Sequence, residues 1–342
     1  MHLVVDGIIE KLQNGGGCSV YFFEVLQRYM RDGHNLRYLN FLTNGSHLIK
    51  GNESVIVEQN DSRLLERWRD VSCKSITPET IFHSTHYRLP ISKAQIVTTV
   101  HDFTYEQYFK GPGQWMHTWQ KNRAINNSDL VICVSNNTAK DLLKFCPISE
   151  EKIRIVYNGV SDTYHFLEHE CRGNKVVFIG ARGGYKNFNI AVQAVASVNE
   201  LSLSIVGGGQ LTKEELQCLQ MYLPDRYQWL GRLSDEELNV VYNRAFCLLY
   251  PSSYEGFGIP VAEAMRAGCP VIAVNSSSIP EVAGDAGLLV SMPEVALFVD
   301  ALHQLLVTRN REELVSRGLL QSKKFAWENC YQNTLSVYKE LI

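Results

Sequence analysis

The sequence predicts an α/β protein made of two domains, each a doubly wound parallel sheet covered by helices. The chain has 342 residues, the length of two ordinary domains. Its β-branched runs are nearly continuous rather than alternating with polar residues, which is typical of parallel strands buried on both faces. The runs form two series separated by stretches of helical length, which indicates two sets of βαβ units.

The first series predicts five strands with helices between them. We expect these strands at Val4–Val5, Leu36–Leu42, Val55–Val57, Ile96–Val100 and Leu130–Val134. Ser135 follows the last of them, and its hydroxyl can accept a backbone N–H from the first turn of a helix. We therefore expect a helix from Asn136 to Phe145.

The second series predicts five more strands. They are expected at Val176–Ile179, Leu203–Val206, Tyr227–Leu230, Phe246–Tyr250 and Val271–Val274. Between them, Ser234 and Glu237 have the spacing of a capping box, which predicts a helix ending near Arg244.

The polar segment 161–174 is the best candidate for a linker. We therefore expect an N-terminal domain of residues 1–165, a C-terminal domain of residues 166–325, and a final helix within 326–342 that crosses back to the N-terminal domain. Two such domains place a cleft at the carboxyl ends of their strands, where ligands usually bind.

Composition excludes several classes of protein. Hydrophobic residues make up 45% and charged residues 20%, and the net charge of −3 argues against a general nucleic-acid binder. There is no run of 18 apolar residues, and the first residues lack the basic region of a signal peptide. The nine cysteines are scattered without a CxxC pair. These features favour reduced thiols in a cytoplasmic protein over disulfides or a zinc site.

The strongest motif joins Glu255 to Glu263. Gly256 and Gly258 allow a tight turn after a strand, and Pro260 suits the first position of the helix that follows. The amides at that helix start attract phosphate, and the two carboxylates could accept hydrogen bonds from sugar hydroxyls. Alternatively, Glu263 only complements the helix dipole and Glu255 is solvated.

This stretch resembles the E-x7-E motif of family 4 glycosyltransferases, which are retaining enzymes with the GT-B fold of two Rossmann-like domains. The similarity covers most of the chain. Further matching pieces are Gly15-Gly16-Gly17, Thr99–Asp102, Ser135–Thr138, Tyr157–Val160, Phe178–Arg182 with Lys186-Asn187, Leu230–Ser234 and Tyr250–Ser252. The segment Phe82–Arg88 is similar to a variant found in bacterial surface-polysaccharide mannosyltransferases.

The resemblance implies a role for each matching residue of the C-terminal half. Glu263 would bind the nucleotide ribose, and Glu255 would contact the donor sugar. Arg182 and Lys186 would hold the diphosphate, where two cations can neutralise the charge of the leaving group without a metal. The backbone amides of Gly256, Phe257 and Gly258 would add donors to the phosphates.

In the N-terminal half the resemblance places His101 near the donor sugar and phosphate. Gly16 and Gly17 could admit the donor diphosphate or the acceptor. The glycine run lacks the dinucleotide fingerprint, because Val20 stands in place of the third glycine. Gly207–Gly209 fails the same test at Thr212, so we interpret it as a turn.

Two further segments have competing interpretations. His83 and His86 lack a third ligand at metal-binding spacing, so we assign them to acceptor contacts or to packing. The segment 108–123 interleaves Trp115 and Trp119 with basic residues, a pattern that fits an anionic membrane interface or core packing.

We therefore expect a retaining, metal-independent glycosyltransferase. It would transfer a sugar from a nucleotide-sugar donor to a glycan or lipid-linked acceptor in bacterial surface-polysaccharide synthesis. The first expectation for the donor is GDP-mannose, with mannose as the transferred sugar. The enzyme would make peripheral contact with the inner membrane. The alternatives are a nucleotide-sugar epimerase of GT-B shape and a non-catalytic nucleotide-sugar-binding protein.

Overall fold

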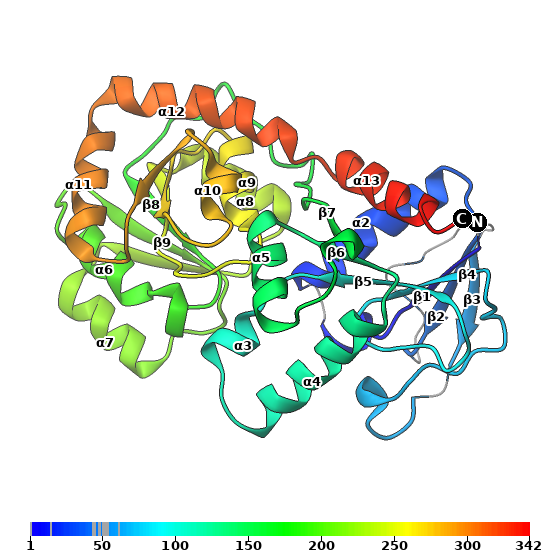
Figure 1. Ribbon diagram of the computed structural model, residues 1–342. Helices are drawn as coiled ribbons and strands as arrows, with labels where there is room; N and C mark the ends of the chain where they lie inside the picture. The colour runs from blue at the N-terminus through cyan, green and yellow to red at the C-terminus, as the bar shows by residue number, and fades with distance from the viewer. Residues whose placement is uncertain (1, 14–15, 43–45, 47–48, 50–54, 61) are drawn as a thin grey trace. The chain divides into compact units, whose positions relative to one another are not determined.

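The computed structural model describes residues 2–13, 16–42, 46, 49, 55–60 and 62–342, which fold as two compact units (Figure 1). The N-terminal unit comprises Met1–Gly159 together with Trp327–Ile342, and the C-terminal unit comprises Val160–Ala326. Each unit is a parallel sheet packed with helices, so the predicted α/β class with two doubly wound sheets is confirmed.

The N-terminal sheet has the strand order β3-β2-β1-β4-β5-β6-β7, and all its pairings are parallel. Its strands are β1 (His2–Asp6), β2 (Leu36–Asn40), β3 (Val55–Gln59), β4 (Thr80–Ser84), β5 (Gln95–Val100), β6 (Leu130–Cys133) and β7 (Ile153–Ile155). The sequence prediction missed β4 and β7. β4 carries a histidine among polar residues, and β7 is only three residues long.

The helices of this unit cover two apolar faces. They are α1 (Ile9–Leu12), α2 (Gly17–Arg31), α3 (Thr104–Tyr108), α4 (Pro112–Asn127), α5 (Asn136–Phe145) and α13 (Trp327–Lys339). Tyr21 and Tyr29 of α2 and Tyr338 of α13 share one core cluster, so the end of the chain packs beside α2 (Figure 1). The Ser135 hydroxyl accepts the Thr138 N–H at 3.0 Å, which confirms the predicted cap of α5.

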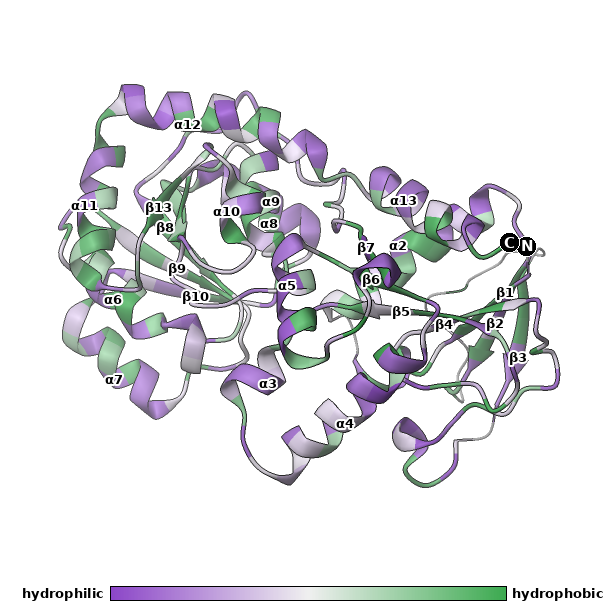
Figure 2. Ribbon diagram, viewed as in Figure 1, coloured by the Kyte–Doolittle hydropathy of each residue, from purple (hydrophilic) through white to green (hydrophobic). Residues whose placement is uncertain are grey.

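The C-terminal sheet has the order β10-β9-β8-β11-β12-β13, again all parallel. Its strands are β8 (Lys175–Ile179), β9 (Ser202–Val206), β10 (Tyr227–Gly231), β11 (Cys247–Tyr250), β12 (Val271–Val274) and β13 (Gly287–Val290). Only β13 was not predicted. Most strands of both sheets are hydrophobic along their length, as expected for strands buried on both faces (Figure 2).

Seven α-helices accompany this sheet. They are α6 (Phe188–Ala196), α7 (Lys213–Tyr222), α8 (Asp235–Arg244), α9 (Ile259–Arg266), α10 (Ile279–Ala283), α11 (Val295–Leu306) and α12 (Thr308–Gln321). The predicted capping box of α8 is present, with the Ser234 hydroxyl and the Glu237 carboxylate each accepting the other's backbone N–H. Across the described residues, no helix is both long and apolar enough to cross a membrane.

Candidate active site

Three loops of the C-terminal unit are joined by hydrogen bonds at the carboxyl edge of its sheet. They follow β8, β11 and β12, which are neighbours in that sheet. The Ser253 N–H donates to the Tyr185 carbonyl at 2.8 Å, and the Ser276 hydroxyl donates to the Ser253 carbonyl at 2.7 Å. The Ser278 hydroxyl donates to the Glu255 carbonyl at 2.9 Å. These bonds fix the backbone around Glu255, at the edge of a parallel sheet where ligands usually bind.

Lys186 and Glu255 meet across two of these loops. The Lys186 ammonium donates to Glu255 Oε1 at 2.5 Å and lies 3.4 Å from the Tyr250 hydroxyl. Both charged side chains are partly exposed, at 14% and 13%. The structure therefore brings together a cation that can form an ion pair with a phosphate and a carboxylate that can accept a hydrogen bond from a hydroxyl. Their assigned roles remain predictions.

The turn between Glu255 and α9 requires glycine at one position. Gly258 has a φ of 94°, and a Cβ atom there would lie 2.6 Å from Ile279 Cδ1. The helix begins at Ile259, so Pro260 occupies its second position, one residue later than expected. The amino end of α9 thus lies directly after the motif glycines, where its dipole favours an anion.

Glu263 lies in a cluster of polar groups that sequence reasoning missed. The Tyr242 hydroxyl donates to Glu263 Oε2 at 3.2 Å, and the Tyr164 hydroxyl donates to Asp235 Oδ1 at 2.9 Å while also contacting the Glu263 carboxyl. Desolvation, reinforced by the charge of Asp235, raises the pKa of Glu263 to about 8. No sequence signal pairs these residues, because Tyr164 comes from the polar segment before β8 and Tyr242 from α8.

Arg182 is buried, and its guanidinium clamps a neighbouring loop. It donates to the carbonyl oxygens of Gly207 at 2.8 Å, Gly209 at 3.0 Å and Gln210 at 2.8 Å, and its Nε lies 3.0 Å from Glu215 Oε2. Gly207–Gly209 is a turn, as interpreted, with three successive φ values between 71° and 74°. In this structure most donors of Arg182 bind protein carbonyls. Its diphosphate role therefore stays a prediction.

The N-terminal residues of interest follow the first and fifth strands. Gly16 is the N-cap of α2 and Gly17 its first residue, whereas Gly15 lies outside the described residues. Among the described residues no atom lies within 4 Å of a Cβ built on Gly17, so the described surroundings of the start of α2 leave room for a ligand. His101 follows β5, and its Nε2 is buried without a hydrogen-bond partner among the described residues. Burial lowers the pKa of His101 to about 4, so the ring is neutral.

The structure separates the two histidines of the Phe82–Arg88 segment. His83 is fully buried, with Nδ1 2.6 Å from the Tyr338 hydroxyl and Nε2 2.9 Å from the Thr99 hydroxyl. It therefore packs in the core. His86 is partly exposed, and its Nε2 has no partner in the described part of the chain. Among described residues no three His, Cys, Asp or Glu side chains are grouped to hold a metal.

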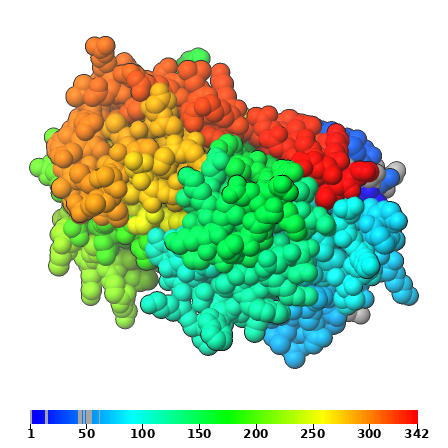
Figure 3. Space-filling model, viewed as in Figure 1, coloured from blue at the N-terminus to red at the C-terminus, as the bar shows by residue number. Residues whose placement is uncertain are grey.

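The aromatic segment is exposed, so core packing of its tryptophans is the wrong alternative. Trp115 is 80% and Trp119 is 56% exposed. We call the exposed large apolar residues of α3 and α4, together with Phe109 directly after α3, the aromatic surface: Tyr105, Tyr108, Phe109, Trp115, Met116 and Trp119. The α3–α4 segment lies at the surface in the view of Figure 3.

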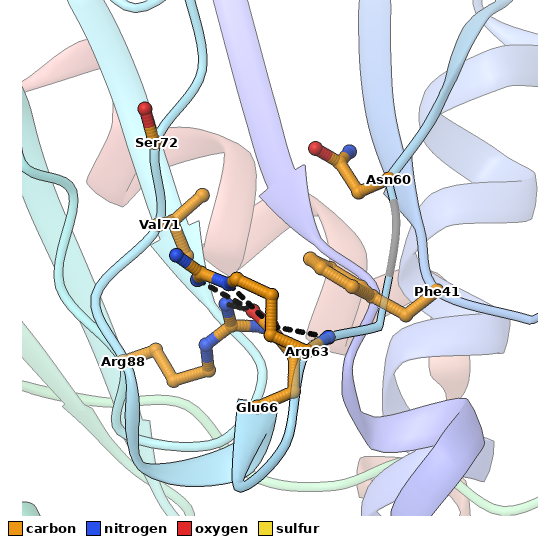
Figure 4. Close-up of a pocket in the computed structure, with 7 residues that line it drawn as sticks. All are labelled: Phe41, Asn60, Arg63, Glu66, Val71, Ser72 and Arg88. Atoms are coloured by element: carbon orange, nitrogen blue, oxygen red, sulfur yellow. Dashed lines mark hydrogen bonds and ion pairs between the residues drawn. The ribbon is translucent and has the colours of Figure 1, made fainter.

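A small cavity of about 290 Å³ lies in the N-terminal unit, close to the ends of β2 and β3 (Figure 4). Its polar groups mostly bind one another. Arg88 donates to Glu66 Oε1 at 2.5 Å and to Asp6 Oδ1 at 3.0 Å, and Arg63 donates to both Glu66 oxygens. None of the predicted site residues lines this cavity. Its lining residues are Phe41, Asn60, Arg63, Glu66, Val71, Ser72 and Arg88.

Two family models match the chain, one for each half. Residues 15–164 match Glycosyltransferase Family 4, and residues 166–318 match Glycosyl transferases group 1. The chain is 29% identical over 303 residues to O-antigen chain mannosyltransferase B of Escherichia coli, covering 82% of this chain and 79% of that protein.

Solved structures resemble the chain over its full length. Sucrose-phosphate synthase from Thermosynechococcus elongatus matches with a TM-score of 0.78 at 18% identity. The match covers 100% of this chain and 99% of the synthase chain. HepE of Anabaena, solved with UDP and glucose, has a TM-score of 0.76 at 15% identity, with 99% of each chain covered. At these identities the likeness shows the fold, which is GT-B.

Proposed function

The chain belongs to the glycosyltransferases of group 1 and family 4, and we propose that it transfers mannose from GDP-mannose with retention of anomeric configuration. The acceptor is a glycan or lipid-linked saccharide of O-antigen type. The observation that carries this proposal is the Lys186–Glu255 pair beside the amino end of α9. The similarity to an O-antigen mannosyltransferase supports mannose as the sugar.

The pair has the chemistry that a nucleotide-sugar donor needs. When the bond between the anomeric carbon and the diphosphate oxygen breaks, its electron pair moves onto that oxygen. The acceptor oxygen bonds to the anomeric carbon, and its proton passes to the departing diphosphate oxygen. Lys186 attracts the growing charge and so favours the transition state over the bound donor. Glu255, released from Lys186 when the phosphate arrives, accepts a hydrogen bond from a sugar hydroxyl.

Donor identity is tested by ligand-induced stabilisation. Thermal shift with GDP-mannose, UDP-glucose and ADP-glucose should rank GDP-mannose first. A ligand present at a hundred times its Kd stabilises the folded state by about 2.7 kcal/mol. Equal thermal shifts with all three nucleotide sugars would contradict GDP-mannose as the preferred donor.

Reaction class is tested with the preferred donor, with and without an acceptor saccharide. We expect an α-linked product by NMR, unchanged turnover in excess EDTA, and no isomerised donor when the acceptor is omitted. A β-linked product contradicts retention. Activity that EDTA abolishes and manganese restores contradicts metal independence, and an isomeric donor identifies an epimerase.

We further propose that the aromatic surface contacts the membrane that holds a lipid-linked acceptor. Indole rings partition well at the interface, and Glu106, the only acidic residue between 103 and 127, is buried against Lys121 at 2.8 Å. The exposed surface of α3 and α4 thus offers an anionic lipid head group no repulsive charge.

Vesicle sedimentation tests this contact. The protein should pellet with vesicles containing phosphatidylglycerol, and a Trp115→Ala, Trp119→Ala variant should remain in the supernatant. Trp229→Ala in the C-terminal unit, where the ring is 39% exposed, is the matched control. Undiminished pelleting of the double variant would remove the proposal.

A further inference from the structure

Three successive serines after β12 bind the main chain around Glu255 from one side. The Ser277 hydroxyl accepts the Glu255 N–H at 2.9 Å and donates its own proton to the Ser276 carbonyl at 2.8 Å. The Ser278 hydroxyl donates to the Glu255 carbonyl, and the Ser276 hydroxyl donates to the Ser253 carbonyl. Both main-chain polar groups of Glu255 are therefore held by side chains of one neighbouring loop.

Two of these serines have given up arrangements that are favourable locally. Ser277 has a φ of 53°, in the left-handed region that serine adopts less readily than glycine or asparagine. Ser278 is the N-cap of α10, yet its side chain makes no cap hydrogen bond with that helix. A serine at this position ordinarily accepts an N–H from the first turn. In place of these arrangements, both residues contact Glu255.

Asn187 holds the same loop from the side of Lys186. Its φ is 52°, and its side-chain amide donates to the Pro251 carbonyl and to the Ser253 hydroxyl, each at 2.8 Å. Lys186, the residue before it, forms the ion pair with Glu255. The main chain behind each member of the ion pair is therefore fixed, and the two side chains meet in a defined place.

The contact between the serine loop and the Glu255 loop is closely packed. Ser278 is fully buried, and a Cβ atom on Gly258 would lie 2.6 Å from Cδ1 of Ile279, the first residue of α10. An alanine at position 278 would preserve this packing but remove the hydroxyl. The Glu255 carbonyl would then lose a donor that water outside the packed contact does not replace in the same geometry.

We infer that Ser276, Ser277 and Ser278 are positioning residues that fix the Glu255 carboxylate for its contact with the donor sugar. This inference rests on the proposed function, in which Glu255 accepts a hydrogen bond from a sugar hydroxyl. Such a bond is strong only over a narrow range of distance and angle, so a shift of the main chain by about 1 Å weakens it. The serines therefore act on the sugar-dependent part of donor affinity and not on the nucleotide.

Calorimetry with GDP-mannose and GDP tests the inference. GDP lacks the sugar, so the difference between the two affinities isolates the contacts that the sugar makes. A hydrogen bond to a charged group contributes about tenfold or more to affinity. Partial loss of its geometry in Ser277→Ala and Ser278→Ala should therefore weaken GDP-mannose binding about three- to tenfold and leave GDP binding unchanged.

Further variants separate positioning from support of the fold. Ser277→Gly removes the hydroxyl and relieves the left-handed backbone, so it should weaken GDP-mannose binding as Ser277→Ala does while the unit stays folded. Ser276→Thr keeps a hydroxyl and should retain the affinity that Ser276→Ala loses. Ser322→Ala removes a buried serine hydroxyl that donates to the Leu319 carbonyl of the same unit, and it should change neither affinity.

Hydrogen exchange supplies a readout that is independent of ligands. The Glu255 amide should exchange faster in Ser277→Ala than in wild-type protein, because its acceptor is gone. Equal weakening of GDP and GDP-mannose in the serine variants would show general structural support and overturn the inference. Wild-type GDP-mannose affinity in all three serine-to-alanine variants would overturn it as well.

Two outcomes distinguish the inference from the proposed function. If Glu255→Gln weakens GDP-mannose binding selectively but the serine variants behave as wild type, Glu255 contacts the sugar and the positioning role is wrong. If the serine variants and Glu255→Gln all lose the sugar-dependent affinity but wild-type protein transfers mannose to no saccharide, the inference stands and the proposed function fails.

Discussion

The two units share a sheet plan but differ in what they bury. The N-terminal unit buries Arg88 and Lys121, each at or below 1% exposure and each paired with carboxylates. In the C-terminal unit, all of whose residues are described, Arg182 is the single buried charged residue, while Lys186 and Glu255 stay accessible at strand ends. The N-terminal unit thus uses two buried cations to hold its own segments, whereas the C-terminal unit buries only Arg182 for that purpose and keeps the Lys186–Glu255 pair accessible to a ligand. This division agrees with the proposed binding of the nucleotide-sugar donor on the C-terminal unit.

The largest effect we predict comes from Arg88→Ala. It leaves the buried carboxylates of Asp6 and Glu66 without their shared cation, and breaking a buried pair costs about 3–5 kcal/mol. Urea unfolding followed by hydrogen exchange should show the loss in the N-terminal unit. Arg63→Ala removes an exposed partner of the same Glu66 and should cost below about 1 kcal/mol. Equal losses of unfolding free energy in Arg88→Ala and Arg63→Ala would show that burial does not make the Arg88 ion pairs more important for stability than the Arg63 pair.

Lys186→Ala should act on rate rather than stability. Removing a preorganised charge from a developing anion costs about 2.7–4 kcal/mol in barrier, or roughly 10²–10³ in turnover. Lys175→Ala, a change on an exposed side chain of the same unit, should leave turnover unchanged. Turnover at saturating donor decides: a loss smaller than about tenfold with the fold intact would make Lys186 an ordinary surface charge.

Arg182→Ala, in the same unit, should act on stability rather than on rate. Its hydrogen bonds to three carbonyl oxygens fix the loop 207–210, and a hydrogen bond to a charged group is worth about 1.5–3 kcal/mol. We expect a lower free energy of unfolding and faster exchange in that loop. If stability is unchanged but turnover falls as for Lys186→Ala, Arg182 serves the diphosphate rather than the loop.

Acid should affect the two units in opposite directions. Burial lowers the pKa of His83, His86 and His117 to about 3, so the unfolded chain binds more protons below pH 6.5 and the N-terminal unit loses stability as pH falls. Glu263, with a pKa raised to about 8, binds more protons when folded, so its contribution grows as pH falls from 8 to 4.5. Each group contributes up to about 1.4 kcal/mol per pH unit.

Hydrogen exchange between pH 7.5 and 5.5 checks this comparison unit by unit. Burial raises the pKa of Asp6 to about 6, so this carboxyl binds more protons in the folded state. Near pH 5.5 it therefore offsets part of the stability that one histidine loses. Parallel stability profiles in the two units would contradict the assignment of these protonation states.

The smallest effects concern two helix caps. Ser135→Ala removes a hydrogen bond to the buried N–H of Thr138, at a cost of about 2 kcal/mol, whereas Ser234→Ala removes one to the exposed N–H of Glu237, which water can reach, at about 0.5–1 kcal/mol. Chemical denaturation of both variants measures the difference. A larger loss for Ser234→Ala would reverse the expected order.

Local patterns predicted most of the fold, because strands and caps depend on neighbouring residues. β13 was missed because its run begins at Gly287, and the start of α9 was misplaced by one residue at Pro260. Family resemblance supplied Glu255 and Lys186 separately, and the structure shows them paired. Tyr164 and Tyr242 could not have been found, because their contacts with Glu263 join segments far apart in the chain.

The position of α13 determines the order in which this protein can be completed during synthesis. The apolar cluster around Leu3, Tyr21 and Tyr29 is closed by Trp327, Tyr331 and Tyr338. The ribosome makes the whole C-terminal unit before it makes these three residues, at roughly 5–20 residues per second. The first unit to leave the ribosome is therefore the last to bury its core. For many seconds a nascent chain must keep that apolar surface from aggregating while the second unit folds inside the loop that α13 later closes.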